Sequence, residues 1–382
     1  MAIAGNVLIT GAEVGRVDRG NRGAEQLLAT AATRAQGAGF RPTVAFGKVD
    51  GALRSSLNLK SYVGNPRAQI LDRITPSLDV LGYTSIKALD GVLDASGYAL
   101  GDPWGAHTAT WIAKKYDQWS RVGVPIVALP QAYGPFENRA VAEASRNALE
   151  RCSLVFAREK TSYEHLLALG IHPSMCRIAP DITLGEHRKS TSGRSNRLVI
   201  VPNWNLRERV GGDGYVSSLR DIAEWAQGSG MEVAGLLHEG PKDLAILEEL
   251  SDLLDGGIYS ELTGWSVKDF LASSTVVVSG RYHAVAACLT SRTPVVVHSW
   301  SHKYKELLAL YDLVGCMADP TDSSNTISKI ESATSTHHGD SRVSSQQEHI
   351  DRSVEAMWHN VFSILDQKRS NPRVTNWKLS SS

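Results

Sequence analysis

Ser279-Gly280-Arg281-Tyr282-His283-Ala284 follows the β-branched run Ser274-Thr275-Val276-Val277-Val278 and precedes a small-residue segment that ends at Leu289. The run predicts a buried parallel strand, and the segment after it predicts a helix. The glycine turn therefore places an arginine and a histidine where a strand ends and a helix begins. Unpaired backbone N–H groups and the helix dipole make such a position favourable for anions. Taken alone, Arg281 and His283 are explained more simply by capping and packing of the turn.

Strands and helices are expected to alternate along the whole chain. In the first half, apolar runs predict strands near 6–11, 43–46, 91–95, 125–129, 153–157 and 176–179, and helical patterns fall near 23–36, 67–81, 106–121, 138–150 and 161–169. In the second half, strands are expected near 198–201, 231–237, 274–278 and 294–298, with helices near 215–227, 244–254, 267–272, 284–289, 304–311 and 327–333. This alternation indicates βαβ units and hence an α/β protein with parallel sheets.

A polar segment, 185–196, interrupts the alternation and is expected to be a linker. It separates two predicted Rossmann-like, doubly wound domains, 1–184 and 197–345, and a chain of 382 residues favours two cores over one. The His- and Ser-rich stretch 335–346 is interpreted as a loop of unassigned role. An amphipathic helix is expected over 346–368 and could cross back from the second domain. The tail, 369–382, is expected to be disordered.

Composition and charge argue against several classes of protein. Lys+Arg and Asp+Glu number 40 each, so the overall charge does not favour a nucleic-acid or membrane-surface partner. No run of 18 apolar residues occurs, so no membrane span is expected, and Met1 to Gly11 reads as a strand and not as a signal peptide. The four cysteines lack C-x-x-C spacing, which argues against a zinc site and a disulfide framework. Such cysteine usage fits a reducing compartment, and we expect the cytoplasm.

Polar side chains gather after the predicted strands, which is where open parallel sheets bind ligands. If the two sheets face each other across a cleft, Arg158 would lie on one wall and Arg281 and Lys303 on the other. Cations on both walls suit a small ligand with two anionic groups, because a guanidinium matches phosphate and carboxylate bidentately. Each group also has a structural explanation, since Arg158 could pair with Glu159 or Glu164 on the surface. The same holds for the histidines and tryptophans near these strand ends, His238, His298, His302, Trp204 and Trp300.

Several familiar motifs are missing from the sequence. The chain lacks G-x-x-x-x-G-K-[ST], D-x-D, H-E-x-x-H and G-x-S-x-G, and its early glycines do not complete G-x-G-x-x-G. We therefore expect neither a P-loop nucleotide site nor a metal-bound nucleotide-sugar site, and no residue cluster requires a metal.

Four stretches of the chain are distinctive in their order and spacing. They are Asn21-Arg22-Gly23-Ala24-Glu25; Leu129-Pro130-Gln131-Ala132-Tyr133-Gly134-Pro135-Phe136; Phe156-Ala157-Arg158-Glu159-Lys160-Thr161-Ser162 with Leu169-Gly170-Ile171 and Ala179-Pro180-Asp181; and Ser279-Gly280-Arg281-Tyr282-His283-Ala284 with Thr293-Pro294 and His302-Lys303. Together they resemble the polysaccharide pyruvyl transferase family, and the resemblance covers most of the chain, roughly Asn6 to Leu313. The chain departs from the family's pattern at Asp94-Ala95-Ser96-Gly97-Tyr98, where a glycine cluster is frequent, and at Tyr282, where a leucine is frequent.

The resemblance implies two Rossmann-like halves similar to the B-type glycosyltransferases. It also implies transfer of pyruvate from phosphoenolpyruvate, a donor substrate and not a cofactor, onto a sugar to form a cyclic ketal. Arg158 and Arg281 would hold the phosphate and carboxylate of phosphoenolpyruvate, and His283 would act in acid/base catalysis beside Arg281. The other predicted substrate-binding residues are Asn21, Gln131, Asn203, Tyr282 and Lys303.

Two other functions stay open on the sequence alone. One is a B-type glycosyltransferase that uses a nucleotide sugar, and the other is a non-catalytic carbohydrate-binding relative. The acceptor saccharide, its reacting hydroxyls, its attachment to a lipid and the oligomeric state are open as well.

Overall fold

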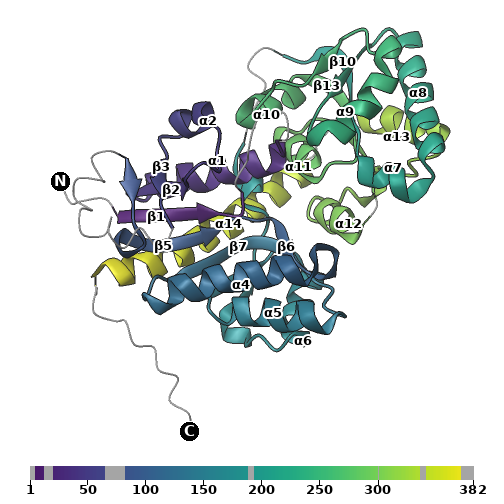
Figure 1. Cartoon of the computed structure of the whole chain (residues 1–382). Coiled ribbons are helices and arrows are strands. Elements are labelled where there is room, and N and C mark those ends of the chain that lie inside the picture. Colours follow the sequence, from purple (N-terminus) through teal and green to yellow (C-terminus); the bar gives the residue numbers. More distant parts are fainter. Residues whose placement is uncertain are drawn as a thin grey trace. The chain divides into compact units, whose positions relative to one another are not determined.

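The computed structural model describes residues 5–12, 20–64, 82–187, 193–299, 301–335 and 341–370. The chain forms two compact units, which are considered separately (Figure 1). The first unit comprises Met1–Gly15, Leu27–Ile182 and Ser353–Ser382, and the second comprises Arg16–Gln26 and Thr183–Arg352. The short segment that ends at Gln26 therefore belongs with the second unit, although the strand before it belongs to the first.

The first unit is built on a nine-stranded parallel sheet. Its strands are β1 Gly5–Thr10, β2 Phe40–Ala45, β3 Lys60–Tyr62, β4 Tyr83–Thr84, β5 Leu89–Asp94, β6 Tyr98–Leu100, β7 Ile126–Tyr133, β8 Leu154–Ala157 and β9 Cys176–Ile178. They lie in the order β4-β3-β2-β1-β5-β7-β8-β9, and β6 pairs with β7. The chain thus builds outward from β1 to β4 and then returns to place β5 on the other side of β1, so the strand order reverses at β1.

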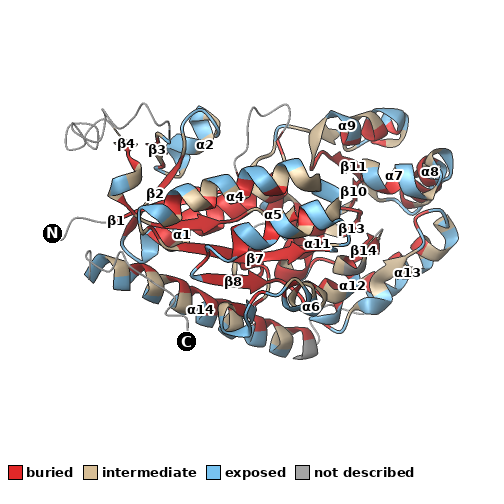
Figure 2. Cartoon of the chain, turned by 60° about the horizontal axis from the view of Figure 1, so that its bottom comes forward, coloured by how far each residue is buried: buried red, intermediate tan, exposed pale blue. Residues whose placement is uncertain are grey.

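Helices cover both faces of this sheet. The helices of this unit are α1 Arg22–Gly37, α4 Gly105–Arg121, α5 Arg139–Leu149, α6 Lys160–Ala168, the later part of α14 Ser341–Ser370 and the short helix α2 Gly51–Ser56, which has no buried residue. Leu8 of β1 packs in one core with Ile112 and Tyr116 of α4, whereas the glycine at Gly91 of β5 lies against Leu365 of α14. Figure 2 shows β7 and β8 buried between α4 and α5 on one side and α14 on the other.

The second unit has a six-stranded sheet in the order β12-β11-β10-β13-β14-β15. The strands are β10 Ser195–Val201, β11 Glu232–Leu236, β12 Ile258–Tyr259, β13 Ser274–Ser279, β14 Val295–His298 and β15 Met317–Ala318. The helices are α7 Trp204–Val210, α8 Gly212–Gly228, α9 Gly240–Glu249, α10 Gly264–Ala272, α11 Tyr282–Ser291, α12 His302–Ala309 and α13 Ser323–Ser335. Val276 and Val278 of β13 are buried with Leu198 and Ile200 of β10. The carboxyl end of β13, where α11 begins, therefore lies at the centre of the sheet's ligand-binding edge.

The predicted α/β class with two parallel sheets is confirmed, and so is the alternation of strands and helices along the described chain. The longer buried parallel strands are continuous apolar runs, which is why the sequence located them within a few residues. The two- and three-residue strands β3, β4, β6, β12 and β15 and the short helix α2 were not predicted, because so few residues carry no periodicity. Helix α7 was missed, because a seven-residue helix shows less than two turns of periodicity. The described helices include none that is long and apolar enough to cross a membrane.

The prediction of a loop over 335–346 is wrong for its second half. Helix α14 begins at Ser341 and continues to Ser370, so it is longer than the helix expected over 346–368 and takes two residues from the expected tail. The sequence did not predict this early start, because residues 341–349 are mostly polar and only Val343 among them belongs to the buried apolar stripe that continues at Ile350. The helix expected over 67–81, residues 188–192 of the expected linker, residues 336–340 and the tail beyond 370 lie outside the described residues.

Candidate functional site

The turn between β13 and α11 is fixed by side chains from two neighbouring elements. Asn203 Nδ2 and Tyr304 Oη each donate a hydrogen bond of 2.6 Å to the Gly280 carbonyl oxygen. A Cβ added at Gly280 would come within 2.9 Å of the Asn203 Cβ, so the close approach requires glycine. Asn203, a predicted substrate-binding residue, thus uses its amide to hold the turn.

Arg281 lies at the N-terminus of α11 and is almost fully buried. Its Nε donates to Asp243 Oδ2 at 2.7 Å, its Nη2 donates to Asp243 Oδ1, and its Nη1 donates to Glu239 Oε2. Asp243 is fully buried and also accepts a bond from the Trp204 backbone N at 2.9 Å. Burial raises the pKa of Asp243 to about 6 although Arg281 opposes the shift. The guanidinium fork expected to receive a ligand is therefore occupied by two carboxylates.

The first turn of α1 packs against the same strand ends. Asn21 Nδ2 donates to Glu239 Oε1 at 2.9 Å, and the Arg22 backbone N donates to the His238 carbonyl oxygen at 3.0 Å. The buried Arg22 side chain bonds Glu25 Oε1 at 2.7 Å, and Glu25 Oε2 accepts from the Gly264 backbone N at 2.8 Å. These bonds explain why the segment that ends at Gln26 belongs to the second unit.

Two histidines lie at the centre of this cluster. His283 is in the first turn of α11, and Gly23 of α1 approaches its ring so closely that an added Cβ would overlap with Nδ1. His238 follows β11 and is 2% exposed, and neither of its ring nitrogens has a hydrogen-bond partner among the residues that the structure describes. Burial lowers the pKa of His238 well below its usual range, and the nearby Arg281, His283 and Arg22 lower it further. His238 is therefore a neutral imidazole with unused hydrogen-bonding capacity.

Three helices, α1, α9 and α11, begin within this cluster, as the bonds from Asn21, Arg22 and Arg281 show. Each helix N-terminus carries a partial positive charge that favours anions. Glu239 and Asp243 now balance that charge together with the Arg281 guanidinium. The Glu239 side chain is 40% exposed and the Asp243 side chain is fully buried, so only Glu239 can be exchanged at low cost for an incoming anion.

Arg158 belongs to the first unit and is held in a comparable way. Its Nη1 donates to Asp181 Oδ2 at 3.0 Å, and its Nε lies 3.4 Å from Glu159 Oε2. Asp181 is fully buried, while Glu159 also accepts a hydrogen bond from Ser162. The sequence allowed a surface ion pair between Arg158 and Glu159. The structure shows that this pair is buried and that Asp181 is a second partner of Arg158. The buried amide of Gln131 lies near Asp94 in the same unit.

The structure places the other predicted residues at or near the same turn. Tyr282 packs edge-on against His283, with ring centroids 5.2 Å apart, and against Tyr304 at 6.2 Å. The Lys303 Nζ lies 5.4 Å from the centroid of the Tyr304 ring. His298 is buried and shares a hydrogen bond with Thr326, which agrees with a structural role for that histidine. Trp300 and the His302 side chain lie outside the described residues.

Sequence reasoning missed the residues that hold the site together. Asp243 is not among the predicted site residues, Arg22 and Glu25 appear only within the first of the four family stretches, and His238 is given a structural explanation near a strand end. An acidic residue in the first turn of a helix, as Asp243 is in α9, is so common that it carries no signal of its own. Among the residues that the structure describes, no group of three or more His, Cys, Asp or Glu side chains is placed to hold a metal ion.

The fold defines a class of proteins. The chain is similar to HepE of Anabaena in complex with UDP, with 12% identity, a TM-score of 0.57 and coverage of 96% of this chain and 100% of that one. It is also similar to the UDP-GlcNAc 2-epimerase of Neisseria meningitidis (13% identity, TM-score 0.56, coverage 95% and 99%) and to a UDP-glucosyltransferase of Polygonum tinctorium (12%, 0.53, coverage 96% and 100%). These likenesses establish the two-sheet fold of the B-type glycosyltransferases.

The family follows from the sequence itself. Residues 50–302 match the polysaccharide pyruvyl transferase family, and this stretch is about two thirds of the chain. The chain therefore belongs to that family, as its four sequence stretches predicted. No curated protein matches the chain.

The buried pair predicts a large stability loss when Asp243 is neutralised. Asp243→Asn leaves the Arg281 charge without its buried partner, so the free energy of unfolding should fall by about 3 kcal/mol or more. The matched control is Asp252→Asn, which breaks the exposed pair with Arg220 and should cost below about 1 kcal/mol. Urea unfolding followed by circular dichroism measures both, and equal losses would contradict the role of Asp243.

His238 predicts a pH-dependent loss of stability. The pKa of His238 in the folded protein is lowered, so below about pH 6.5 the unfolded chain binds a proton at this residue and the folded protein does not. The free energy of unfolding should therefore fall as the pH drops below that value and be fully retained above it. His238→Gln should reduce this slope, whereas the exposed His172→Gln should leave it unchanged. An identical pH slope in wild type and His238→Gln, from urea titrations at several pH values, would disprove the assignment.

Proposed function

We propose that the protein transfers pyruvate from phosphoenolpyruvate to a saccharide and forms a cyclic ketal. Family membership supports the class of reaction. The observation that carries the donor is the cluster around Arg281 and His283, where three helix N-termini and a buried guanidinium favour anions beside a histidine. Phosphoenolpyruvate carries both a phosphate and a carboxylate, so it matches such a cluster better than a neutral sugar does.

His283 is the proposed general acid. Protonated His283 gives its proton to the methylene carbon of phosphoenolpyruvate, which becomes a methyl group, and the adjacent carbon gains oxocarbenium character. A sugar hydroxyl adds to that carbon and gives its proton back to His283. Phosphate then leaves with the electrons of its C–O bond, a second hydroxyl of the same sugar adds and closes the ketal, and the proton of that hydroxyl passes to the phosphate. The products are the ketal and inorganic phosphate, so atoms and charges balance without a redox partner.

Arg281 has two parts in this proposal. Its bonds to Asp243 fix the start of α11 and therefore the position of His283. Its Nη1 faces Glu239, and an anionic group of phosphoenolpyruvate would take the place of that carboxylate. For Arg158 of the first unit, the second anion-binding role that the resemblance implies is a separate proposal, and Asn21, Gln131, Tyr282 and Lys303 are further proposed substrate contacts. The acceptor is a saccharide, and we infer action in the cytoplasm, where phosphoenolpyruvate is available.

The activity is tested by incubating the protein with phosphoenolpyruvate and candidate saccharides. Release of inorganic phosphate together with a product whose mass has gained a pyruvate ketal supports the proposal. The competing function is glycosyl transfer from a nucleotide sugar, and the similar HepE structure, which is a complex with UDP, is the reason to test it. That reaction would release a nucleoside diphosphate, need no phosphoenolpyruvate, and overturn the proposal.

His283→Ala should lower the turnover number about 10²–10⁴-fold, the usual contribution of a positioned general acid. Gly23→Ala should also lower it, because the new methyl group displaces the His283 ring while leaving its chemistry intact. Gly228→Ala is the matched control, since its Cβ meets no atom within 4 Å. Turnover and melting temperature are measured for each variant. Near-wild-type turnover of His283→Ala would show that another group donates the proton.

Glu239→Gln should bind phosphoenolpyruvate more tightly than the wild type, by several-fold in Kd. The anion then no longer has to displace a carboxylate from Arg281, and the amide oxygen can still accept from Asn21. Calorimetry measures the affinity, and Glu261→Gln, an exposed glutamate outside the cluster, is the control. Weaker binding by Glu239→Gln alone would indicate that the carboxylate itself assists the ligand.

A further inference from the structure

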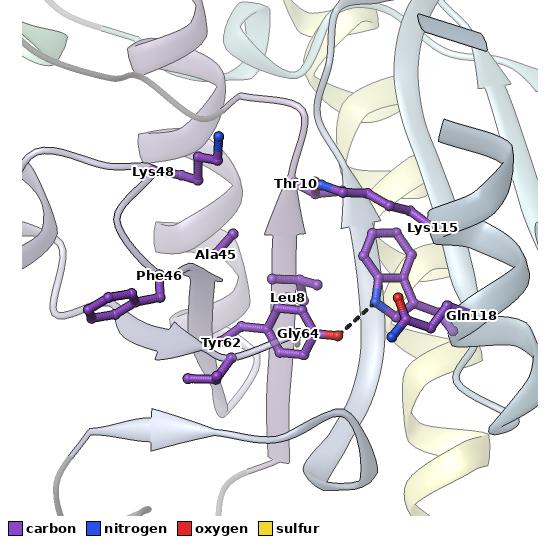
Figure 3. Close-up of a pocket in the computed structure, with 11 residues that line it drawn as sticks. Leu8, Thr10, Ala45, Phe46, Lys48, Tyr62, Gly64, Lys115 and Gln118 are labelled. Carbon is purple, nitrogen blue, oxygen red and sulfur yellow. Dashed lines mark hydrogen bonds between the residues drawn. The ribbon is translucent and has the colours of Figure 1, made fainter. Parts of the chain in front are cut away.

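His238 is a buried histidine of the second unit that the proposed mechanism does not use. Only 2% of its surface is exposed, and neither ring nitrogen has a hydrogen-bond partner among the residues that the structure describes. His298, the other buried histidine of the described chain, shares a hydrogen bond with Thr326. In a cavity of the first unit, the buried Trp119 Nε1 likewise donates to the Tyr62 Oη at 3.2 Å (Figure 3).

An imidazole with both nitrogens unpaired in a buried place is costly. A buried polar group without a hydrogen bond costs about 1–3 kcal/mol, and native proteins therefore pair nearly all such groups. The exceptions are explained by a catalytic role or by a bound molecule that supplies the missing hydrogen bonds. Both nitrogens of His238 are thus candidates for contact with a substrate.

The His238 ring lies beside the groups that are proposed to hold phosphoenolpyruvate. Its carbonyl oxygen accepts from the Arg22 backbone N at 3.0 Å, where α1 begins. The next residue, Glu239, bonds Arg281 and immediately precedes α9. The positive charges of Arg281, His283 and Arg22 all act on the ring. An anion that replaces Glu239 at Arg281 would therefore bind next to His238, within the same unit.

The surrounding charge limits what the His238 ring can do with a proton. Burial lowers the pKa of His238 well below its usual range, and the three neighbouring positive charges lower it further. An imidazolium is unfavourable here, so His238 cannot store a proton between two steps. A neutral imidazole can still pass a proton on, because it carries an N–H on one nitrogen and a lone pair on the other.

We propose that His238 relays a proton when the ketal closes. The second sugar hydroxyl gives its proton to the unprotonated ring nitrogen of His238, while the N–H of the other nitrogen gives its proton to the departing phosphate. One sugar O–H bond and one ring N–H bond break, and a new ring N–H bond and a phosphate O–H bond form. The ring stays neutral and ends in its other tautomer, which reverts by exchange with water after the products leave. The inference rests on the proposed function, since it supplies the route of one proton in that reaction.

The test uses the full chain, phosphoenolpyruvate and a saccharide that the wild type converts to a ketal. His238→Ala should lower the turnover number about 10²–10⁴-fold, as loss of a positioned acid–base group usually does. The KM for phosphoenolpyruvate should rise by at most about tenfold, which is the worth of one neutral hydrogen bond. His238→Gln should lose as much turnover, because an amide can donate and accept hydrogen bonds but cannot exchange tautomers.

Small imidazoles distinguish a relay from a simple base. 4-Methylimidazole has the ring of histidine with both nitrogens free, so it should restore turnover to His238→Ala. 1-Methylimidazole has the same size, but its methyl group blocks one nitrogen, so it can accept a proton and cannot pass one on. It should restore no turnover. An equal gain with the two compounds, or no gain with either, would overturn the relay.

A second measurement observes the ring without depending on turnover. In protein labelled with ¹⁵N at the histidine rings, the His238 signals are those that disappear in His238→Gln. They should have the chemical shifts of a neutral imidazole and should change when phosphoenolpyruvate is added. Signals that do not respond would show that packing or an enclosed water satisfies the ring, and would overturn the contact with substrate.

A matched control completes the design. His172→Ala removes an exposed histidine of the first unit, so its turnover should equal that of the wild type and respond to neither imidazole. Melting temperatures verify that all variants fold. Turnover near that of the wild type in both His238 variants would overturn the relay and leave the proposed function standing. A wild type that forms no ketal, with His238 signals that still respond to phosphoenolpyruvate, would overturn the proposed function instead.

Discussion

The buried ion pair between Asp243 and Arg281 is the interaction on which the second unit's ligand edge depends. One carboxylate accepts two hydrogen bonds from the Arg281 guanidinium and a third from the backbone of Trp204, so it ties α9 to the starts of α11 and α7. Removing either partner would leave an uncompensated buried charge, which destabilises the folded protein strongly, so the two residues are needed together. The position of His283, in the first turn of α11, follows from it.

The two arginines share one electrostatic arrangement. Each is buried, each pairs with a fully buried aspartate, and each has a glutamate beside it: Asp243 and Glu239 for Arg281, Asp181 and Glu159 for Arg158. A cation held in this way is pre-positioned, because its side-chain entropy is already lost and its fork already oriented. The aspartates fix the guanidinium groups. For Arg281, the half-exposed Glu239 is the partner that an anionic ligand can replace.

The two units carry different chemical groups at their strand ends. The second unit gathers helix N-termini, a guanidinium and two histidines, which suit a small anion and proton transfer. The first unit has a cavity at its strand ends that is lined in part by aromatic side chains and two lysines. Both lie where parallel strands end and helices leave the sheet, so the fold supplies the sites and the side chains set their chemistry.

The sequence by itself determined the alternation of elements, the α/β class, the family and the strand-to-helix turn that carries Arg281 and His283. Those properties depend on short stretches of sequence, namely apolar runs, helical periodicity and a glycine between a run and a helix. The partners of these residues were decided only by the tertiary structure. Asp243 lies 38 residues before Arg281, Glu25 reaches Gly264 across 239 positions, and the cavity walls come from four separate elements. Burial and ion pairing depend on which distant segments the sheet brings together, and no local pattern in the chain records that.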